Sequence, residues 1–232
     1  MTRSPPLPWS AIDTVLLDMD GTLLDLRFDT VFWQEYLPER YAAHHEVDTE
    51  AARERIGELM RGAHPRLDYY CFEWWSRATG LDIGALKPDL AHLIAWREGA
   101  EAFVGGVRAT GRRAIIVTNS HPSGIALKHS VTGIADHVDA LEHAHDHAHP
   151  KEHARFWERV HARLDFDPAR TLLVDDNLEV LASAERFGIA HLRAVAHPDS
   201  GRPPLEDLPY PAVHAFAELL AELHSSAEED PR

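Results

Sequence analysis

Three short apolar runs in this sequence are each followed at once by polar side chains that can do chemistry. The runs are residues 14–17, 114–117 and 171–174. Continuous apolar runs of this length are typical of strands buried on both faces of a parallel sheet. The carboxyl ends of such strands open onto one crevice, where ligands bind, so we expect the polar groups to meet there. These groups are Asp18, Asp20, Thr118, Asn119, Asp175 and Asp176.

Four of these groups are carboxylates, which repel one another unless a cation joins them. Carboxylate oxygens are preferred ligands of Mg²⁺, which also shares its coordination with substrate phosphate. Lys151, in a loop between the second and third runs, adds a positive charge. The sequence therefore predicts a magnesium site that takes an anionic phosphate ester as substrate.

The spacing of Asp18 and Asp20 suits phosphoryl transfer. A carboxylate at the end of a strand can attack phosphorus in line, and a second, two residues on, can protonate the leaving oxygen and later take a proton from water. Thr118 offers a hydroxyl and Asn119 a backbone N–H to the phosphoryl oxygens. Lys151 supplies positive charge as the transition state spreads charge over those oxygens. We therefore predict Asp18, Asp20, Thr118 and Lys151 as catalytic, and Thr118, Asn119 and Lys151 as substrate-binding.

Each motif taken alone has a structural alternative. An Asp-x-Asp-Gly sequence also occurs in turns and calcium loops. Asp175 and Asp176 could cap the helix that follows them, residues 118–120 could form an ordinary turn, and Lys151 could be a solvated lysine. The order of all four motifs, at strand ends or in a following loop, favours the catalytic interpretation.

The rest of the sequence divides into two parts. Residues 26–97 have helical character and follow directly on the first strand, with Asp29 and Asp48 as candidate N-caps. From residue 98 onward strands and helices alternate. A weaker strand is expected at 137–141, and the last strand is expected at 190–195. We therefore predict an α/β fold with helices on both faces of a parallel sheet, a core of residues 1–25 and 98–232, and a helical cap of residues 26–97. The ends, up to Ser10 and from 228 to 230, are expected to be an arm and a frayed tail.

Composition narrows the partners. The 232 residues carry a net charge of -15, which argues against nucleic acid or an anionic membrane as a partner. The single cysteine, Cys71, excludes an internal disulfide and is interpreted as a small buried apolar residue, with a catalytic thiol as the alternative. Neither a signal segment nor a membrane-spanning run is found, so the cytoplasm is the expected location, and the oligomeric state is left open.

The four motifs in this order resemble those of the haloacid-dehalogenase superfamily. The resemblance implies a Rossmann-like core, an inserted helical cap and Mg²⁺. It also implies an aspartyl-phosphate on Asp18, which would be nucleophile and metal ligand. Asp20 would be the acid/base and a ligand through its carbonyl, and Asp175 and Asp176 would complete the metal site.

A more specific resemblance is to the bacterial GMP/IMP nucleotidase branch of this superfamily, and it implies a purine nucleoside 5′-monophosphate as substrate. A sugar-phosphate or phosphoglycolate phosphatase, or a phosphomutase, is the alternative within the superfamily. A phospho-accepting signalling receiver or a non-catalytic binding protein is the alternative from another class. The resemblance is carried by residues 13–26, 80–83 and 150–152 with Trp9, Phe32, Trp33, Tyr70, Cys71, Trp75, Ser76, Thr118, Asn119, His121 and Pro122.

Two further groups of residues have no assigned role. His143, His145, His147 and His149 alternate in sequence, and an extended segment would place all four on one side, as a zinc or nickel site requires. The preferred interpretation is a polar loop beside the site. Aromatic and arginine side chains of the cap are candidates for contact with a nucleotide, although core packing is the preferred interpretation of the aromatic residues and an ordinary surface charge the alternative for the arginines. They are Phe28, Trp33, Tyr69, Tyr70, Trp74, Trp75, Arg61, Arg66 and Arg97.

Overall fold

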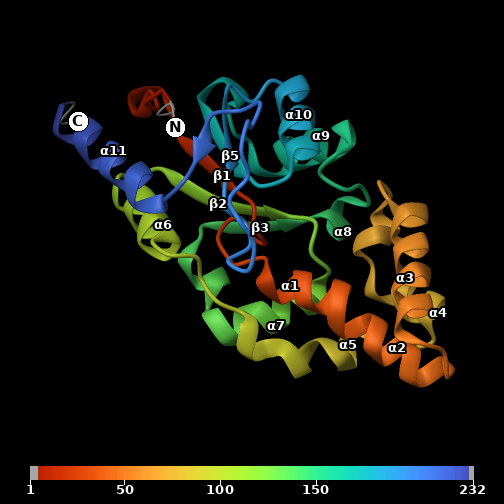
Figure 1. The fold of residues 1–232 in the computed structure, drawn as a ribbon. Helices are drawn as coiled ribbons and strands as arrows, with labels where there is room; N and C mark the ends of the chain where they lie inside the picture. The colour runs from red at the N-terminus through yellow and green to blue at the C-terminus, as the bar shows by residue number, and fades with distance from the viewer. Residues whose placement is uncertain (1–4, 230–232) are drawn as a thin grey trace.

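The computed structural model describes residues 5–229 and is built on one six-stranded parallel sheet (Figure 1). The strand order is β3-β2-β1-β4-β5-β6, with β1 hydrogen-bonded between β2 and β4. The three strands that end in the predicted motifs are therefore neighbours at the centre of the sheet. The strands are β1 (Thr14–Leu17), β2 (Arg113–Thr118), β3 (Ala140–His143), β4 (Thr171–Asp175), β5 (His191–Val195) and β6 (Ala212–Val213).

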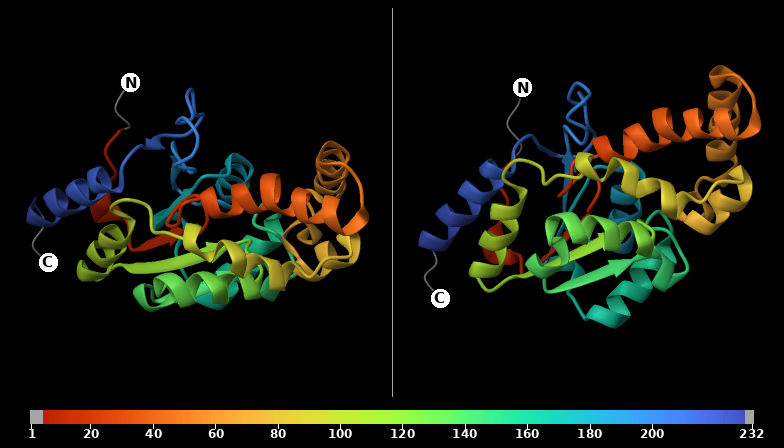
Figure 2. Two further views of the ribbon diagram at one scale, coloured as in Figure 1. Left: turned by 60° about the horizontal axis from the view of Figure 1, so that its bottom comes forward. Right: turned by 90° about the horizontal axis from the view of Figure 1, so that it is seen from below.

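Helices cover both faces of this sheet (Figure 2). Along β1, Val15 and Leu17 join the apolar cluster on one face, whereas Leu16 joins the cluster on the other. All four β1 residues are buried for this reason, which explains the continuous apolar run. The predicted α/β fold is confirmed. The first face carries α6 (Ala100–Ala109), α7 (Pro122–Thr132) and α11 (Phe216–Glu229); the second carries α9 (Ala154–Leu164) and α10 (Leu178–Phe187).

The helical segment of residues 27–93, between β1 and α6, lies beyond the ends of the central strands (Figures 1 and 2). It has an apolar cluster of its own, in which Phe32, Ile56 and Trp75 are almost fully buried. Its elements are α1 (Arg27–Val31), a π-helical turn (Phe32–Tyr36), α2 (Leu37–His45), α3 (Thr49–Ala63), a 3-10 turn (Leu67–Tyr70), α4 (Phe72–Thr79), α5 (Ile83–Leu86) and a 3-10 helix (Lys87–Leu93). As predicted, the Asp48 side chain caps α3 by accepting from Ala51 N–H.

Three predictions about the elements are wrong. The strand expected at 137–141 begins at Ala140, because residues 134–137 form a 3-10 helix that ends at His137. The strand after α10 is not the last, since β6 adds a two-residue edge. The opening arm is anchored, with Trp9 buried in the core. At the other end α11 includes Glu228 and Glu229, and residue 230 lies outside the described residues.

The remaining helical elements are short, and they connect the strands and helices described above. Among residues 5–229, no helix combines the length and the apolar character that a membrane span requires. These elements are Trp9–Ala11, Ile134–His137, α8 (Ala144–His147) and Pro168–Arg170.

Candidate active site

One cavity of about 300 Å³ lies at the carboxyl ends of the central strands. All seven side chains predicted from the motifs line it, although they are drawn from four separate stretches of the chain. The helical segment of residues 27–93 also contributes to the cavity wall. The seven residues are Asp18, Asp20, Thr118, Asn119, Lys151, Asp175 and Asp176.

A tight loop after β1 brings Asp18 and Asp20 to the cavity. Gly21 lies in the left-handed region, with φ of 87°, and its N–H donates to Leu24 O at 2.8 Å. A Cβ atom at Gly21 would lie 2.5 Å from Oδ2 of Asp176. Glycine is therefore required at this position for two reasons: other residues adopt this φ only at an energetic cost, and a Cβ atom would clash with Asp176.

Lys151 is the positive centre of the motif residues and is 2% exposed. Its ammonium donates to Oδ1 of Asp18, to Oδ2 of Asp175 at 2.7 Å and to Val117 O at 3.1 Å. Burial favours loss of the Lys151 proton, but Asp175 and Asp18 outweigh burial and raise the pKa of Lys151. Lys151 is therefore a fixed cation between two strand ends, not a solvated lysine.

The carboxylates around Lys151 carry more negative charge than one lysine offsets. Burial and the nearby Asp175 raise the pKa of Asp18 to about 7, against the opposing pull of Lys151. Burial, together with Asp18 and Asp175, raises the pKa of Asp176 well above its usual range. One carboxylate oxygen from each of these three residues lies within 4.8 Å of the others. This hard-oxygen donor set fits Mg²⁺.

Thr118 and Asn119 are held in place by their own hydrogen bonds. Oγ1 of Thr118 accepts from Ser120 N–H at 3.0 Å, which leaves the hydroxyl proton available to a substrate oxygen. The Asn119 side chain accepts from Lys151 N–H at 2.8 Å and donates to Glu152 at 3.0 Å. The asparagine side chain is therefore a structural clamp on the lysine loop.

The helix after β4 does not use the aspartate pair as its cap. Asn177 caps α10 by accepting from Glu179 N–H at 2.9 Å. Oδ1 of Asp175 accepts from Asn177 N–H at 2.9 Å, and its other oxygen faces Lys151. The capping alternative for Asp175 and Asp176 is therefore wrong.

A second buried ion cluster, which the sequence analysis missed, adjoins the motif residues. Nζ of Lys128 lies 2.6 Å from Oδ1 of Asp20 and 2.7 Å from Oδ2 of Asp29, and Lys87 donates to the other oxygen of Asp29. Burial raises the pKa of Asp20 to about 6, and Lys128 limits that rise. Burial opposes ionisation of Asp29 as well, but Lys128 and Lys87 together lower its pKa.

The position of Asp29 in this cluster shows that its predicted role as an N-cap is wrong, and the position of Lys128 corresponds to a signal that was present in the sequence. Asp29 does not cap a helix; it lies inside α1 with its carboxylate buried between two lysines. Lys128 follows Ile125 by three residues on the buried face of α7. A lysine within an apolar helical face was the available signal, because burying a charge is costly unless it is paired. The sequence around Lys87 shows no apolar helical face of this kind, so nothing in it marks Lys87 as buried.

Aromatic side chains of the helical segment form part of the cavity wall. Of the candidates named from the sequence, Trp33, Tyr69 and Tyr70 line the cavity, and the Tyr70 hydroxyl donates to Glu152 at 2.7 Å. Phe72 and Lys87 also line it and were not foreseen. The other six candidates do not line this cavity: Phe28, Trp74, Trp75, Arg61, Arg66 and Arg97.

The histidine tract does not present its four rings on one side, because Ala144–His147 form a helical turn. His147 is buried against Glu142 at 2.7 Å, and His149 stacks on His153. His145 points elsewhere, toward His121, with ring centroids 4.8 Å apart. Burial lowers the pKa of His145 to about 4, so that this ring is neutral near pH 7.

Comparison with known proteins agrees with this geometry. The family model described as haloacid dehalogenase-like hydrolase matches residues 12–188, so the chain belongs to this family. The chain is 36% identical over 217 residues to "GMP/IMP nucleotidase YrfG" of Escherichia coli, a match that covers 94% of this chain and 98% of that protein. The protein of the same name from Shigella flexneri matches with the same identity and coverage.

A solved structure supports the fold independently. The HAD phosphatase from Thermococcus onnurineus superposes with a TM-score of 0.75 at 21% identity, covering 91% of this chain and 98% of that one. The predicted superfamily, the α/β fold and the prediction of a hydrolytic enzyme are thereby confirmed, and the receiver and binding-protein alternatives fall away.

Proposed function

We propose that this protein is a Mg²⁺-dependent phosphomonoester hydrolase that forms an aspartyl-phosphate on Asp18 and acts on purine nucleoside 5′-monophosphates such as GMP and IMP. The observation that carries the proposal is the convergence of Asp18, Lys151, Asp175 and Asp176 in one cavity. The buried Asp18 lies beside one fixed ammonium and two further carboxylates. A site with this excess of negative charge can accept a dianionic phosphate only when a cation is bound as well. Asp18, Asp175 and Asp176 would hold the ion, with Asp20 contributing its carbonyl. When bound, Mg²⁺ neutralises charge and polarises the phosphoryl group.

The chain's own residues divide the chemistry between them. A carboxylate oxygen of Asp18 forms the new bond to phosphorus as the ester oxygen leaves, and Asp20 donates a proton to that oxygen. Asp20 then takes a proton from the water that cleaves the aspartyl-phosphate, which releases inorganic phosphate and restores Asp18. A pKa of about 6 suits Asp20 to both roles near neutral pH. Thr118 donates its hydroxyl proton to a phosphoryl oxygen, and Lys151 holds charge beside it.

The substrate proposal rests on the nucleotidase relatives and on the cavity wall. Residues 26–97, which we propose act as a cap over the core of residues 1–25 and 98–232, contribute Trp33, Tyr69, Tyr70 and Phe72 to that wall. Flat aromatic rings beside a phosphate site provide surfaces for a purine base. The core contacts are shared by all phosphate monoesters, so discrimination falls to these cap side chains.

The decisive experiment replaces the nucleophile. Asp18→Asn should lower turnover of GMP by more than about a thousandfold and abolish acid-stable labelling of the protein by substrate phosphate, because the covalent route is lost. Asp136→Asn, the same change at an exposed aspartate outside the cavity, is the control and should leave both unchanged. Near-normal turnover by the Asp18 variant, or a phosphate found on another residue, would refute the mechanism.

A further inference from the structure

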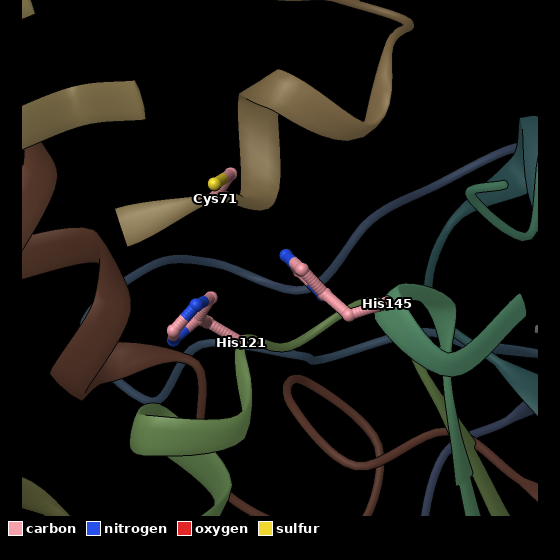
Figure 3. A group of neighbouring side chains, drawn as sticks. All are labelled: Cys71, His121 and His145. Carbon is pink, nitrogen blue, oxygen red and sulfur yellow. The ribbon is translucent and has the colours of Figure 1, made fainter. Parts of the chain in front are cut away.

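Three side chains with soft donor atoms converge where the helical segment meets the core (Figure 3). Cys71 lies between the 3-10 turn and α4, His121 caps α7, and His145 belongs to α8. One donor atom from each lies within 4.8 Å of the other two. None of the three has a role in the phosphoryl chemistry proposed above.

His145 is the least satisfied member of this group. Both of its ring nitrogens are buried, and in the described part of the chain neither has a hydrogen-bond partner. A buried polar group without a partner is unfavourable, so its persistence requires an explanation. The ring faces His121 edge to face, at an interplanar angle of 88°. A bound ion would give one of these nitrogens a partner.

Glu73 provides a fourth group next to two of the three donors. Its Oε2 accepts from Sγ of Cys71 at 3.3 Å and lies 2.9 Å from Nε2 of His121. Nδ1 of His121 accepts from Ser123 N–H at 3.2 Å, so Nε2 carries the ring proton in the free protein. Coordination through Nε2 moves that proton to Nδ1 and breaks the contact with Ser123, and the thiol proton of Cys71 passes to solvent.

We propose that Cys71, His121 and His145, with Glu73 as fourth ligand, form a binding site for a soft transition-metal ion such as Zn²⁺, separate from the carboxylate site of the cavity. Thiolate and imidazole ligands select Zn²⁺ and its neighbours over Mg²⁺, and the four groups suit tetrahedral coordination. Zinc–ligand distances of about 2.0–2.3 Å imply donors roughly 3.3–3.8 Å apart, so the side chains move inward on binding.

The site would tie two parts of the chain together. Cys71 and Glu73 come from the helical segment, and the two histidines come from loops and turns of the core. Phe72 stacks on His121 with centroids 4.5 Å apart, and both line the active-site cavity. A bound ion therefore restrains the helical segment against the core at the edge of that cavity.

Metal binding is tested by titrating the metal-free protein with Co²⁺, which reports thiolate ligation by a charge-transfer band in the near ultraviolet, and then displacing it with Zn²⁺. We expect one equivalent to bind with this band in the presence of excess Mg²⁺. Cys71→Ser should abolish the band, and His145→Ala should weaken binding by more than about 100-fold, beyond the loss that outer-shell changes cause. His149→Ala, in the same tract but stacked on His153, is the matched control and should bind as the unaltered protein does.

Two results would overturn the site: no thiolate band in the unaltered protein, or a band of equal affinity in the Cys71 or His145 variants. Thermal unfolding in a chelator checks that each variant is folded. Asp175→Asn should keep the band, which separates this site from the carboxylate site and makes the test independent of phosphatase activity. Hydrogen exchange of residues 67–79 should slow with Zn²⁺ in the unaltered protein but not in Cys71→Ser; unchanged exchange would refute the restraint.

Discussion

Nζ of Lys128 lies 2.6 Å from Oδ1 of Asp20, so the proposed proton donor is paired with a buried lysine from α7. The same ammonium contacts Asp29 at 2.7 Å, and Asp29 in turn binds Lys87. The lysine limits the rise in the pKa of Asp20 that burial causes. Lys128 therefore lowers the pKa of the group that we propose gives and takes the proton.

Substitution of Lys128 should shift the pH dependence of catalysis. In the proposed mechanism Asp20 can protonate the leaving oxygen only while it carries a proton, so activity should fall as the pH rises above the pKa of Asp20. Lys128→Met removes a charge that lowers this pKa, and the alkaline limb of kcat/KM for GMP should move to higher pH. Lys87→Met is the matched comparison, because its ammonium contacts Asp29 and acts on Asp20 only through a longer-range charge interaction, so its shift should be smaller. An equal shift in both variants would contradict a specific effect of the Lys128–Asp20 contact, and a downward shift with Lys128→Met would contradict the assigned direction.

The predictions from sequence succeeded where one stretch of residues contains the whole signal. The runs at 14–17 and 171–174 are apolar because both faces of their strands are covered, and the motif follows each strand directly. β6 was missed because two residues cannot display a period, and it pairs only with the last two residues of β5. The chain order of the strands was visible, but their spatial order is set by packing and not by any local pattern.

Substitution of Gly21 tests whether its close approach to Asp176 is needed for Mg²⁺ binding. Gly21→Ala places a methyl group 2.5 Å from Oδ2 of Asp176 and forces a side chain into the left-handed region, which costs about 1–2 kcal/mol. Asp176 must move, so we expect Mg²⁺ to bind at least about tenfold more weakly and turnover to fall. Calorimetric titration with Mg²⁺ and thermal unfolding measure the two effects. Gly62→Ala in α3, where a Cβ meets no atom within 4 Å, should be neutral or stabilising. Undiminished Mg²⁺ affinity in the Gly21 variant would contradict the geometry.

The stability of the metal-free protein should depend on pH with an unusual sign. Burial raises the pKa of Asp18 from 3.8 to about 7 and that of Asp20 to about 6, so between roughly pH 4 and 7 the folded state holds protons that the unfolded state has released. The contribution of these two groups is therefore full below pH 4 and is lost as the pH rises through 7. Buried histidines such as His145, with a lowered pKa, have the opposite effect.

A variant isolates this contribution. The unfolding temperature of the unaltered protein minus that of Asp18→Asn, both without metal, should fall as the pH rises from 5 to 8. Mg²⁺ should raise the unfolding temperature of the unaltered protein more at pH 8 than at pH 5, because it binds the ionised carboxylates. A difference that grows with pH in the absence of metal would contradict the assigned pKa of Asp18.

The parts of the site that sequence reasoning missed come from residues that share no spacing rule. Asp29, Lys87 and Lys128 lie on three different helical elements, and only the packing of α1 against the 3-10 helix and α7 brings them together. The alternative interpretation of the histidine tract, with four rings on one side, is wrong for a related reason. The alternation of His143 and His145 suggested an extended segment, but the strand ends at His143 and a helical turn follows at once.

Recognition of the purine base should depend on hydrogen-bond donors in the cavity wall. GMP and IMP have an oxygen acceptor at the six position where AMP has an amino donor, so a buried donor in the cavity wall would reject AMP by being left unpaired, at a cost of about 1–3 kcal/mol. The arginines suggested by the sequence do not line the cavity. The Tyr70 hydroxyl is bonded to Glu152 and the Lys87 ammonium to Asp29. Among the aromatic side chains of the wall in the described residues, the Trp33 N–H and the Tyr69 hydroxyl make no hydrogen bond, so we take them as the candidate donors from the helical segment.

We expect GMP and IMP to exceed AMP by roughly ten- to a hundredfold in kcat/KM. Tyr69→Phe and Trp33→Phe each keep an aromatic ring and are compared with the unaltered protein. The variant that removes the donor to the base oxygen should bring the ratio of kcat/KM for GMP to that for AMP close to one. Tyr36→Phe is the control, because its hydroxyl binds Asp89 outside the cavity. A panel of GMP, IMP, AMP, CMP and small sugar phosphates decides the substrate. If a sugar phosphate or phosphoglycolate is turned over faster than both GMP and IMP, the nucleotide assignment is wrong while the phosphatase chemistry of Asp18 stands.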